Sequence, residues 1–597
     1  MNIHKMSHEQ QQPILKFNKL FFKDFWQLFK PFWVSKEKNK ALGMLILNIG
    51  CILIGVWSTV AINQFNRDFY DALGRFDQAA ILHTLGRFAL LLAVAILVYG
   101  YSSYFSMRIT ILWQRWLTEH FQKNWLSHHN YYHMQITDSG IDNPDQRVSE
   151  DLQQFASSTL SLFFGLFQSI LTLGSFGYVL WTLSGSFEFS VGSLTLNIPG
   201  YLCWAAFLFA VLGTYIIGKM GRKLSGLDYQ QQQCNANFRY GLIRLRENGE
   251  QIAIIGGEEA EKNKLDHLFQ HIYNNFISIS SLQKNLAFFT NGYNILASII
   301  GILFALPLYL AKKTQLGGLM QIAGAFGNVI SAFSVFINSF YLLTQWRAVV
   351  HRLTELNQTM QNLQENKQKT AIILEKTTDF AVEIQNLQIT SPQGAILLND
   401  MNLTFEQGKS YLICGPSGLG KSTLFRAIAG AWYYGSGMIR IHQDALVLFL
   451  PQKPYLPSGS LQDILAYPNP NTFSDTQLQS ILQQCLLDKY LTQLNTATNW
   501  SQILSLGEQQ LLSFGRILLH KPDIIFMDEA TSALDEAKEA HVYATIRNAL
   551  PQTTIISVGH RSSLHQFHDE VIVLALPVLE QTQYPNLDGA SATVLLS

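Results

Sequence analysis

A glycine-rich segment in the second half of the chain has the residue types and spacing of a phosphate-binding loop. Residues 415–422 read GPSGLGKS, which fits the pattern G-x-x-x-x-G-K-[ST]. A short apolar run at 410–414 precedes the segment, and 421–430 has the composition of a helix closed by glycine. Backbone N–H groups and a helix N-terminus bind phosphates in this strand, turn and helix context. The segment therefore predicts a nucleoside triphosphate site.

Side chains in and after this loop could carry out phosphate chemistry. Lys421 would place a positive charge on the β- and γ-phosphates, and the Ser422 hydroxyl would ligate Mg²⁺. About a hundred residues downstream, the apolar run 524–527 ends in Asp528 and Glu529. Asp528 would reach Mg²⁺ through water, and Glu529 would polarise an attacking water. The candidate nucleotide-binding residues of the loop are Gly415, Ser417, Gly418, Gly420, Lys421, Ser422 and Thr423.

Composition divides the chain into a membrane half and a soluble half. Its 597 residues exceed the usual size of one domain, and only 14% of them are charged while 39 are Phe. The net charge is zero and the soluble half has no basic stripe, so nucleic-acid binding has no support. Its 5 cysteines show neither metal-ligand nor CxxC spacing. We interpret them as reduced packing residues.

Uncharged stretches in the first half are long enough to cross a bilayer core, which takes about 20 residues. Eight lysines in residues 1–40, a basic loop at 219–284 and no Lys or Arg in 183–197 place both chain ends in the cytoplasm. Lys312 and Lys313, on the outside, are a mild exception. We expect the third and sixth helices to continue into the cytoplasm. The expected spans are 41–63, 88–107, 159–182, 198–218, 286–311 and 319–344.

The predicted domain order follows from these patterns. In residues 1–40, aromatic residues and lysines alternate at helical spacing, which favours a helix in the membrane interface over a buried soluble helix. Six spans fill 41–350, a polar Gln-rich linker follows at 351–378, and a soluble α/β domain occupies 379–597. Asp68 and Asp71 follow the first span. We interpret them as hydrated loop charges, with a substrate or ion site as the alternative.

Several segments of the soluble half resemble, in order and spacing, the motifs of ATP-binding-cassette (ABC) proteins. Residues 504–510 read LSLGEQQ and resemble the signature motif. Residues 528–535 read DEATSALD and are similar to the Walker B segment and D-loop. Gln452 in LPQKPY resembles the Q-loop glutamine, and His560 in SVGHR resembles the switch histidine. The resemblance covers the whole soluble half.

This resemblance implies a fold and roles for matching residues. The fold is an all-α six-helix transmembrane domain of the exporter type plus an α/β P-loop ATP-binding cassette. Two cassettes pair head to tail, so Ser505 and Gly507 contact the γ-phosphate held by Lys421 of the opposite cassette. The implied catalytic residues are Glu529 as base, His560 at the γ-phosphate and Gln452 as the link to the membrane domain. The implied cofactors are ATP and Mg²⁺. The remaining implied nucleotide contacts are Glu508 and Asp535, and the implied metal set is Ser422, Gln452 and Asp528.

Three positions depart from the family pattern. Leu506 replaces a signature glycine, which we expect to be tolerated because Ser505 and Gly507 remain. Leu511 stands where many members carry Arg, and sequence alone offers no physical account of it. Ser391 occupies the place of the aromatic residue that stacks on adenine, so base stacking has to come from elsewhere or be weak.

The membrane half resembles a narrower group. Residues 66–73 (NRDFYDAL), 143–147 (NPDQR), 246–250 (RENGE) and 256–258 (GGE) resemble the bacterial BacA-type transporters of cobalamin and peptides and the D subfamily of organelles. The resemblance implies a homodimeric half-transporter in a bacterial inner membrane that takes up large hydrophilic solutes. Its implied partners are a second copy of the chain, the lipid bilayer and the solute. Export of lipid, drug or acyl-CoA, an ATP-gated channel and a eukaryotic organelle remain alternatives.

Overall fold

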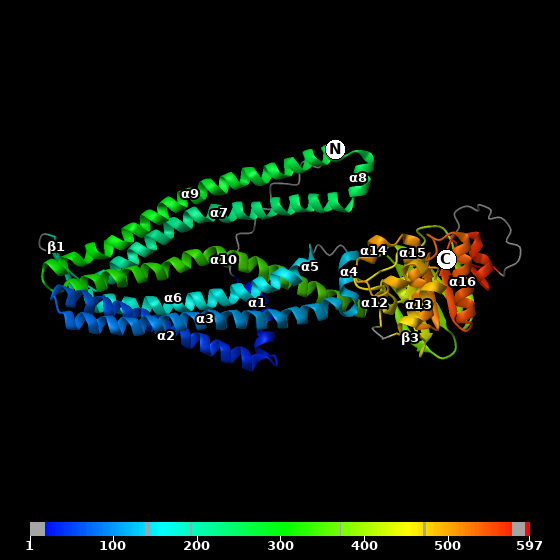
Figure 1. Ribbon diagram of the computed structural model, residues 1–597, viewed down its shortest axis with the longest axis horizontal. Helices are drawn as coiled ribbons and strands as arrows, with labels where there is room; N and C mark the ends of the chain where they lie inside the picture. The colour runs from blue at the N-terminus through cyan, green and yellow to red at the C-terminus, as the bar shows by residue number, and fades with distance from the viewer. Residues whose placement is uncertain are drawn as a thin grey trace. The chain divides into compact units, whose positions relative to one another are not determined.

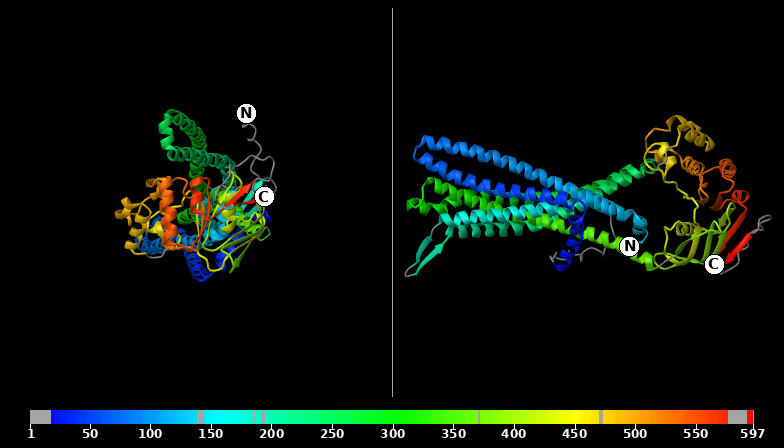
Figure 2. Two further views of the ribbon diagram at one scale, coloured as in Figure 1. Left: turned by 90° about the vertical axis from the view of Figure 1, so that its right-hand side faces the viewer. Right: turned by 90° about the horizontal axis from the view of Figure 1, so that it is seen from below.

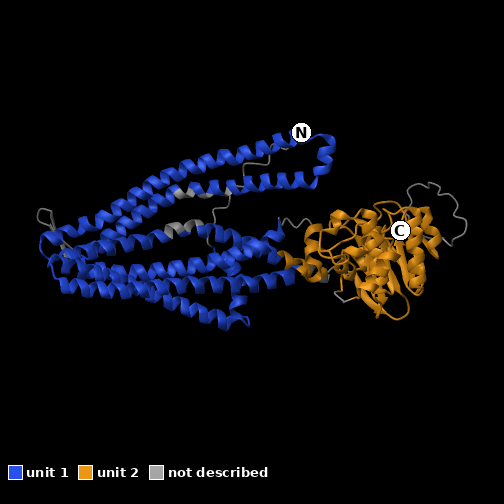
Figure 3. Ribbon diagram, in the orientation of Figure 1, with its two compact units in different colours: residues 1–125, 140–358 blue, residues 126–139, 359–597 orange. Residues whose placement is uncertain are grey.

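The computed structural model describes residues 18–137, 143–184, 186–191, 194–369, 372–469, 473–575 and 592–596. The chain forms two compact units (Figures 1 and 3). The membrane unit holds residues 1–125 and 140–358, and the cassette unit holds residues 126–139 and 359–597. Residues 1–17 of the predicted interfacial segment and residues 370 and 371 of the predicted linker lie outside the described part.

Among the described residues, six helices are long and apolar enough to cross a membrane, as predicted. The longest, α10, has 54 residues, or about 80 Å at 1.5 Å per residue, far more than a hydrocarbon core of about 30 Å. The helices therefore continue well beyond the membrane. The uncharged runs did not predict this length for α7 and α9 because their extensions carry charge. The helices are α2 (Lys38–Gly74), α3 (Gln78–Leu126), α6 (Leu152–Ser184), α7 (Tyr201–Glu247), α9 (Glu258–Leu310) and α10 (Leu316–Lys369).

Helix α1 (Lys19–Val34) carries the predicted alternation of aromatic and charged residues. Asn18 caps it by accepting a hydrogen bond from the Phe21 N–H at 2.9 Å. Phe32 is fully buried and stacks on Trp113 of α3, whereas Leu20 and Trp26 stay exposed. One face of α1 thus packs on the bundle, and the other is free to meet lipid head groups, as an interfacial helix requires.

Short elements connect the long helices. Helices α7 and α9 lie side by side and are joined at one end by α8 (Gly249–Ile255), as Figure 1 shows. The loop after α6 forms an antiparallel hairpin of β1 (Ser186–Val191) and β2 (Leu194–Pro199), which extends from one end of the bundle (Figure 2). Two further turns precede α6: α5 (Pro144–Gln146) and the π-helical η2 (Arg147–Asp151).

Polar contacts fasten α10 to its neighbours at both ends of the membrane unit. The Gly317 N–H in the first turn of α10 donates to Asp71 Oδ1 at 2.8 Å, which gives Asp71 a structural role. At the other end, the Arg352 guanidinium donates two hydrogen bonds, of 2.7 and 2.6 Å, to the buried Asp151 carboxylate. Arg147 donates to Glu355 at 2.8 Å. These contacts hold α10 against α2 and against η2, the turn that leads into α6.

The cassette unit contains a parallel sheet and a smaller mixed sheet. The six-stranded sheet has the order β12-β11-β6-β10-β9-β8, and each pair in it is parallel. The four-stranded sheet has the order β3-β7-β4-β5. Parallel strands require crossover helices, which place loops at the carboxyl ends of the strands. The strands of the larger sheet are β6 (Ser410–Cys414), β8 (Val447–Leu450), β9 (Ile524–Asp528), β10 (Thr554–Val558), β11 (Glu570–Ala575) and β12 (Ala592–Leu596).

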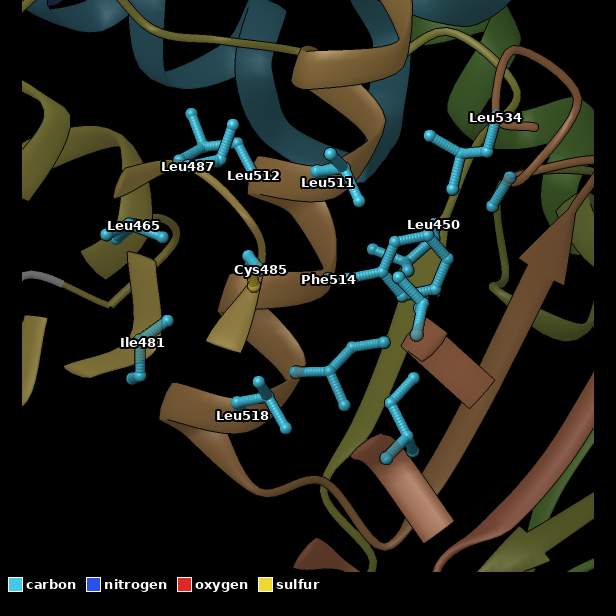
Figure 4. Close-up of a cluster of buried hydrophobic side chains, with 14 of the residues drawn as sticks. Leu450, Leu465, Ile481, Cys485, Leu487, Leu511, Leu512, Phe514, Leu518 and Leu534 are labelled. Carbon is cyan, nitrogen blue, oxygen red and sulfur yellow. The ribbon is translucent and has the colours of Figure 1, made fainter. Parts of the chain in front are cut away.

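The mixed sheet and the helices complete the cassette. The strands of the mixed sheet are β3 (Ile373–Thr377), β4 (Val382–Thr390), β5 (Ile396–Phe405) and β7 (Gly435–His442). Two hydrophobic clusters form the core, one of which lies around α15 (Leu506–His520), where Leu512 lies beside Leu487 and Phe514 lies beside Leu450 (Figure 4). The other α-helices are α11 (Lys421–Ile428), α12 (Leu461–Ala466), α13 (Asp475–Gln484), α14 (Trp500–Ile503) and α16 (Glu536–Ala549). The 3₁₀ turns are η3 (Asp488–Gln493) and η4 (Ser562–Phe567).

Residues 126–139 belong to the cassette unit, although they fall within the 41–350 range assigned to the membrane domain from sequence. This segment contains η1 (Ser127–His129) and α4 (Asn130–Ile136). The His133 ring is buried, and its centroid lies 4.5 Å from that of Tyr433, while Ile136 packs against the cassette core. The uncharged runs predict spans, and they contain no signal for a docking segment in a loop between two spans.

Candidate functional site

The phosphate-loop residues join β6 to α11 at the carboxyl edge of the parallel sheet. Strand β6 is buried along its length apart from Cys414, and α11 begins at Lys421. Gly418 and Gly420 have φ values of 87° and 91°, a left-handed backbone that favours glycine. A Cβ at Gly415 would lie 2.6 Å from the Leu574 carbonyl oxygen. The glycine spacing therefore produces the tight turn before a helix N-terminus that the sequence predicts.

Lys421 folds back over this loop. Its Nζ donates to the carbonyl oxygens of Gly415 at 2.7 Å and Pro416 at 2.8 Å. The residue is only 6% exposed, and burial lowers the pKa of its ammonium group, against the opposing charges of Glu529 and Asp528. The ammonium is thus held within the loop, where it can exchange its carbonyl partners for phosphate oxygens. Of the other loop residues, Ser417 and Gly418 are exposed and Thr423 is buried.

A hydroxyl and a carboxylate meet beside the loop. Ser422 Oγ in the first turn of α11 donates to Asp528 Oδ1 at the end of β9 over 3.0 Å. Hard oxygen ligands of this kind suit Mg²⁺, which commonly completes its shell with water and substrate phosphates. The described residues include no group of three or more His, Cys, Asp or Glu that could hold a metal ion alone. The pair therefore fits a magnesium ion that arrives with its nucleotide.

Glu529 is held between two other predicted site residues. Gln452 Nε2 donates to Glu529 Oε2 at 2.9 Å, and His560 Nε2 lies 3.4 Å from Glu529 Oε1. The Glu529 backbone has a φ of 46°, a left-handed value that is uncommon outside glycine and occurs often at active sites. Strand β9 ends one residue earlier, and the Glu529 N–H donates to the Val558 carbonyl of β10 at 3.0 Å. The fold thus gathers Gln452, Glu529 and His560, which lie far apart in sequence.

The predicted signature residues form the N-terminus of α15. Ser505 is the N-cap: its Oγ and its N–H each lie 2.9 Å from Glu508 Oε2, to which the N–H donates. Glu508, predicted as a nucleotide contact, is thereby directed onto Ser505 and also pairs with Lys489. A Cβ at Gly507 would lie 3.0 Å from the Ala533 carbonyl oxygen, and Leu506 is 44% exposed. The leucine therefore points outward without crowding this turn.

Asp535 has a similar structural contact at the start of α16. Its Oδ1 accepts a hydrogen bond from the Lys538 N–H at 2.8 Å, so it caps the helix. This backbone hydrogen bond, followed by the hydrogen bond from the Lys538 side chain, lowers the pKa of the Asp535 carboxyl. The residue is charged and exposed at the end of the 528–535 segment.

Comparison with known proteins decides the family. The family described as ABC transporter transmembrane region 2 matches residues 28–310, and the ABC transporter family matches residues 398–532. An uncharacterized ABC transporter ATP-binding protein of Haemophilus influenzae is 35% identical over 92% of each chain. The chain belongs to the ABC transporter family.

Other relatives place the transporter more narrowly. The inner membrane ABC transporter ATP-binding protein YddA of Escherichia coli is 31% identical over 91% of this chain and 96% of its own. The human lysosomal cobalamin transporter ABCD4 is 26% identical over 93% of this chain and 95% of its own. A structure of a bacterial Atm1-family ABC exporter with ATP bound has a TM-score of 0.68, 16% identity and coverage of 90% and 94%. That structure shows the exporter-type fold.

The transporter is therefore a half-molecule with one membrane region and one ATP-binding cassette, and it hydrolyses ATP. It is a multi-pass membrane protein whose cassette is cytoplasmic, and this architecture implies dimerisation. The expected ABC resemblance and fold class are thus confirmed.

Gln510 is a residue of the transporter's site that sequence reasoning missed. It is 1% exposed, and its Nε2 donates to the Gln452 carbonyl at 3.0 Å and to Ser532 Oγ at 3.3 Å. Its Oε1 accepts from the Ala533 N–H at 3.0 Å. One side chain of the signature helix thus joins the Q-loop to the D-loop. The sequence carries one indication of its role: Gln510 is a polar residue one turn before Phe514, on the buried face of an amphipathic helix.

Arg561 is a second missed residue. It follows the switch histidine, and its guanidinium donates to the carbonyl oxygens of Leu534 at 2.7 Å and Ser532 at 2.8 Å. The same arginine lies 3.7 Å from the buried Glu539. It therefore connects the switch segment to the D-loop, a contact between distant segments that spacing alone cannot predict.

The structure also accounts for Leu511. The side chain is 2% exposed and belongs to the cluster around α15 (Figure 4), where an unpaired arginine would be costly. At Ser391, the N–H donates to the Ala395 carbonyl at 2.7 Å in a turn after β4. The aromatic position of the family pattern is thus a tight turn in this transporter.

Proposed function

We propose that two copies of this chain form one transporter, in which each of two ATP sites combines the phosphate loop of one cassette with the signature segment of the other. The observation that carries the proposal is the convergence of Lys421, Asp528 and Glu529 with Gln452 and His560 in one cassette. One chain has one such cassette, so a two-cassette site requires a second copy.

The proposed roles follow from these contacts. Lys421 and the N–H groups of 415–423 bind the phosphates, while Ser422 and Asp528 hold Mg²⁺ with Gln452 nearby. Magnesium supplies charge neutralisation at the β- and γ-phosphates. Glu529 accepts the proton of the attacking water, whose oxygen bonds to the γ-phosphorus as the bond to the leaving oxygen of ADP breaks. His560, 3.4 Å from Glu529 Oε1, orients the γ-phosphate end.

Exposed apolar surface supports pairing of two chains. Outside the expected spans, several large apolar side chains of α7, α8 and α9 are exposed, among them Phe269 and Phe276 of α9, and Ile254 and Ile255 of α8 are 77% and 81% exposed. Monomeric proteins rarely leave such a surface uncovered. We infer that the cytoplasmic parts of α7 and α9, together with α8, pack against the partner copy and that the resemblance motifs at 246–258 lie in that contact.

We propose uptake of large hydrophilic solutes, with cobalamin or peptides as the first candidates, across a bacterial inner membrane. The support is the relative described as a lysosomal cobalamin transporter and the inner membrane relative from Escherichia coli. Export of lipid, drug or acyl-CoA is the alternative, which the exporter-type fold favours. An ATP-gated channel is a weaker alternative, because the residues for hydrolysis are complete.

Uptake into proteoliposomes tests this proposal. Labelled cyanocobalamin and a labelled peptide are offered on the face opposite the cassettes, with ATP and Mg²⁺ on the cassette side. We expect ATP-dependent accumulation on the cassette side by the wild type and none by Lys421→Ala. Accumulation in the opposite direction would replace uptake with export, and passive ATP-gated conductance would replace it with a channel.

A further inference from the structure

A groove between α2, α3 and α6 has a polar but uncharged lining. Its volume is about 670 Å³, and none of the described residues that line it is Asp, Glu, Lys, Arg or His. Most of the residues that line it are serine, threonine, asparagine or glutamine, and apolar side chains such as Ile52 and Phe164 also contribute. Small-molecule sites typically occupy about 300–1,000 Å³. The groove is therefore large enough for a solute, and its lining residues all belong to the membrane unit.

The polar side chains of α3 that line the groove form a stripe. Ser102, Ser106, Thr110 and Gln114 follow one another at intervals of four residues, which places them on one face of the helix. Ser102 Oγ donates to Oδ1 of the buried Asn48 on α2 at 2.6 Å. This hydrogen bond fixes two polar lining side chains between the two helices.

Helix α6 presents a matching stripe. Gln153, Ser157 and Ser161 recur every four residues, and Gln168 follows two turns after Ser161. At the position between them, Gly165 adds no side chain and leaves space in the groove. Two polar stripes on two helices of one bundle thus line the same volume.

The amides in these stripes lack partners among the described residues. The side-chain amides of Gln114, Gln153 and Gln168 make no hydrogen bond among the described residues, whereas the Thr110 and Ser157 hydroxyls are satisfied by carbonyl oxygens of their own helices. Gln168 lies within the span expected at 159–182, where an unpaired amide is costly if it faces lipid. Its amide therefore requires water, protein or a ligand in the groove, whereas Gln114 and Gln153 lie beyond the spans, where water can reach them.

The predicted spans give the depth of the groove. Gln114 and Gln153 lie on the cytoplasmic side of the spans expected at 88–107 and 159–182, and Tyr99 and Gln168 lie inside them. The groove thus begins at the cytoplasmic boundary and reaches about the middle of the bilayer. A ligand bound there can exchange with the cytoplasm.

We propose that this groove is a solute site that takes uncharged molecules rich in amide or hydroxyl groups. The inference rests on the proposed transport function and narrows its substrate class. A neutral lining with unpaired amides satisfies neutral donors and acceptors. A coenzyme A thioester carries several phosphate charges, which proteins bind with Arg, Lys or helix N-termini, and the described lining residues include no cation. The geometry therefore favours hydrophilic neutral cargo over acyl-CoA.

Equilibrium binding to the full-length dimer in nanodiscs without nucleotide tests the site. The probes are cyanocobalamin, a blocked neutral tetrapeptide and palmitoyl-CoA. We expect a neutral probe to bind, and Gln153→Leu and Gln168→Leu each to raise its Kd about five- to tenfold, since each removes one hydrogen-bonding group. Gln154→Leu is the matched control: the neighbouring amide lies 3.5 Å from Gln345 on α10 and does not line the groove. Three outcomes would overturn the inference. The first is tighter binding of palmitoyl-CoA than of the neutral probes, and the second is an equal change in Kd for Gln153→Leu and Gln154→Leu. The third is that neither neutral probe binds.

Cysteine labelling separates a solute site from a contact with the second copy. In a variant whose 5 native cysteines are replaced by alanine, Ser157→Cys is treated with a membrane-impermeant maleimide from the cassette side. We expect rapid labelling that the bound neutral probe slows. A cysteine that stays unlabelled in the dimer and becomes reactive on dissociation would assign the groove to the partner chain and overturn the proposal.

ATP-driven uptake is measured in parallel on the same variants. If the wild type takes up the probe and the groove variants show the same Kd and the same uptake as the wild type, the groove proposal is overturned and the transport proposal stands. If binding depends on Gln153 and Gln168 but the wild type shows no uptake, the transport proposal is overturned and the groove remains a solute site.

Discussion

Gln452 Nε2 donates to Glu529 Oε2 over 2.9 Å, which connects the loop after β8 to the carboxylate that follows β9. The two residues lie far apart in sequence, but their strands are neighbours in the parallel sheet. One oxygen of the carboxylate thus accepts a hydrogen bond from an amide, and His560 approaches the other oxygen. We propose that ATP, with its magnesium ion, would give Gln452 a competing partner, so that Glu529 would be free to meet water.

Substitution of Glu529 tests its role as the base. Glu529→Gln keeps the size and the hydrogen-bonding capacity toward Gln452 but cannot accept a proton at neutral pH. We expect ATP turnover to fall by about 100-fold or more, because general base catalysis contributes about 10²–10⁴. ATP binding should persist. Phosphate release from the dimer in lipid measures the effect, with the exposed Glu536→Gln as control. Turnover equal to that of the wild type would assign the base elsewhere.

Gln510 should position the ATP-site loops without touching nucleotide. Gln510→Leu removes the hydrogen bonds to the Gln452 carbonyl and the Ala533 N–H. We expect kcat for ATP to drop about tenfold with little change in KM, and stability to fall by about 1–3 kcal/mol as buried groups lose their partners. Gln483→Leu, at an exposed position on α13, is the control. A loss of stability with normal kcat would make Gln510 a core residue only.

The Arg352–Asp151 pair should stabilise the membrane unit more than surface pairs do. The Asp151 side chain is 6% exposed, so Arg352→Ala leaves a buried carboxylate without its bidentate partner. We expect a loss of about 3–5 kcal/mol, and recovery of most of it in the double variant with Asp151→Asn. The exposed pair of Arg115 and Glu119 gives the comparison, since Arg115→Ala should cost less than about 1 kcal/mol. Thermal unfolding in detergent measures both, and equal shifts would contradict the prediction.

Much of the fold follows from local sequence signals. The six spans came from uncharged runs, which depend only on the hydrophobic thickness of a bilayer. Strand β6 and helix α11 came from a motif whose glycines have a direct backbone consequence. By contrast, the assignment of residues 126–139 to the cassette unit depends on the buried contact of His133 with Tyr433. That contact joins segments about 300 residues apart, and neither segment carries a local signal for it.

The candidate site likewise contains residues that the sequence predicts and contacts that only the fold reveals. Lys421, Ser422 and Asp528 were predictable because a short motif and a strand end specify them. The joint contacts of Gln510 and the tether from Arg561 to the D-loop required the fold, since each joins loops that follow different strands. The groove polar stripes were visible only once α3 and α6 were placed side by side, because isolated serines in apolar spans usually bond to their own helix.

Stability of the cassette should depend on pH through His568. This histidine is 8% exposed; its Nδ1 lies 2.7 Å from the Leu564 carbonyl oxygen, and its Nε2 lies 2.8 Å from Ser557 Oγ. Burial lowers its pKa to about 4, against an opposing effect of the Leu564 hydrogen bond. The neutral ring is therefore favoured in the folded state, and protonation favours unfolding.

The stabilisation is fully present above the unfolded-state pKa of about 6.5 and is lost as pH falls from there toward 4. We expect the loss to reach about 3 kcal/mol near pH 4. The free energy of unfolding of the full-length protein is measured across this pH range and compared with that of His568→Gln. The difference in this free energy between the two proteins should shrink as pH falls. Carboxylates such as Asp569 also titrate in acid, and the comparison cancels their effect because both proteins contain them. A His568→Gln curve parallel to that of the wild type would show that the ring does not titrate on unfolding.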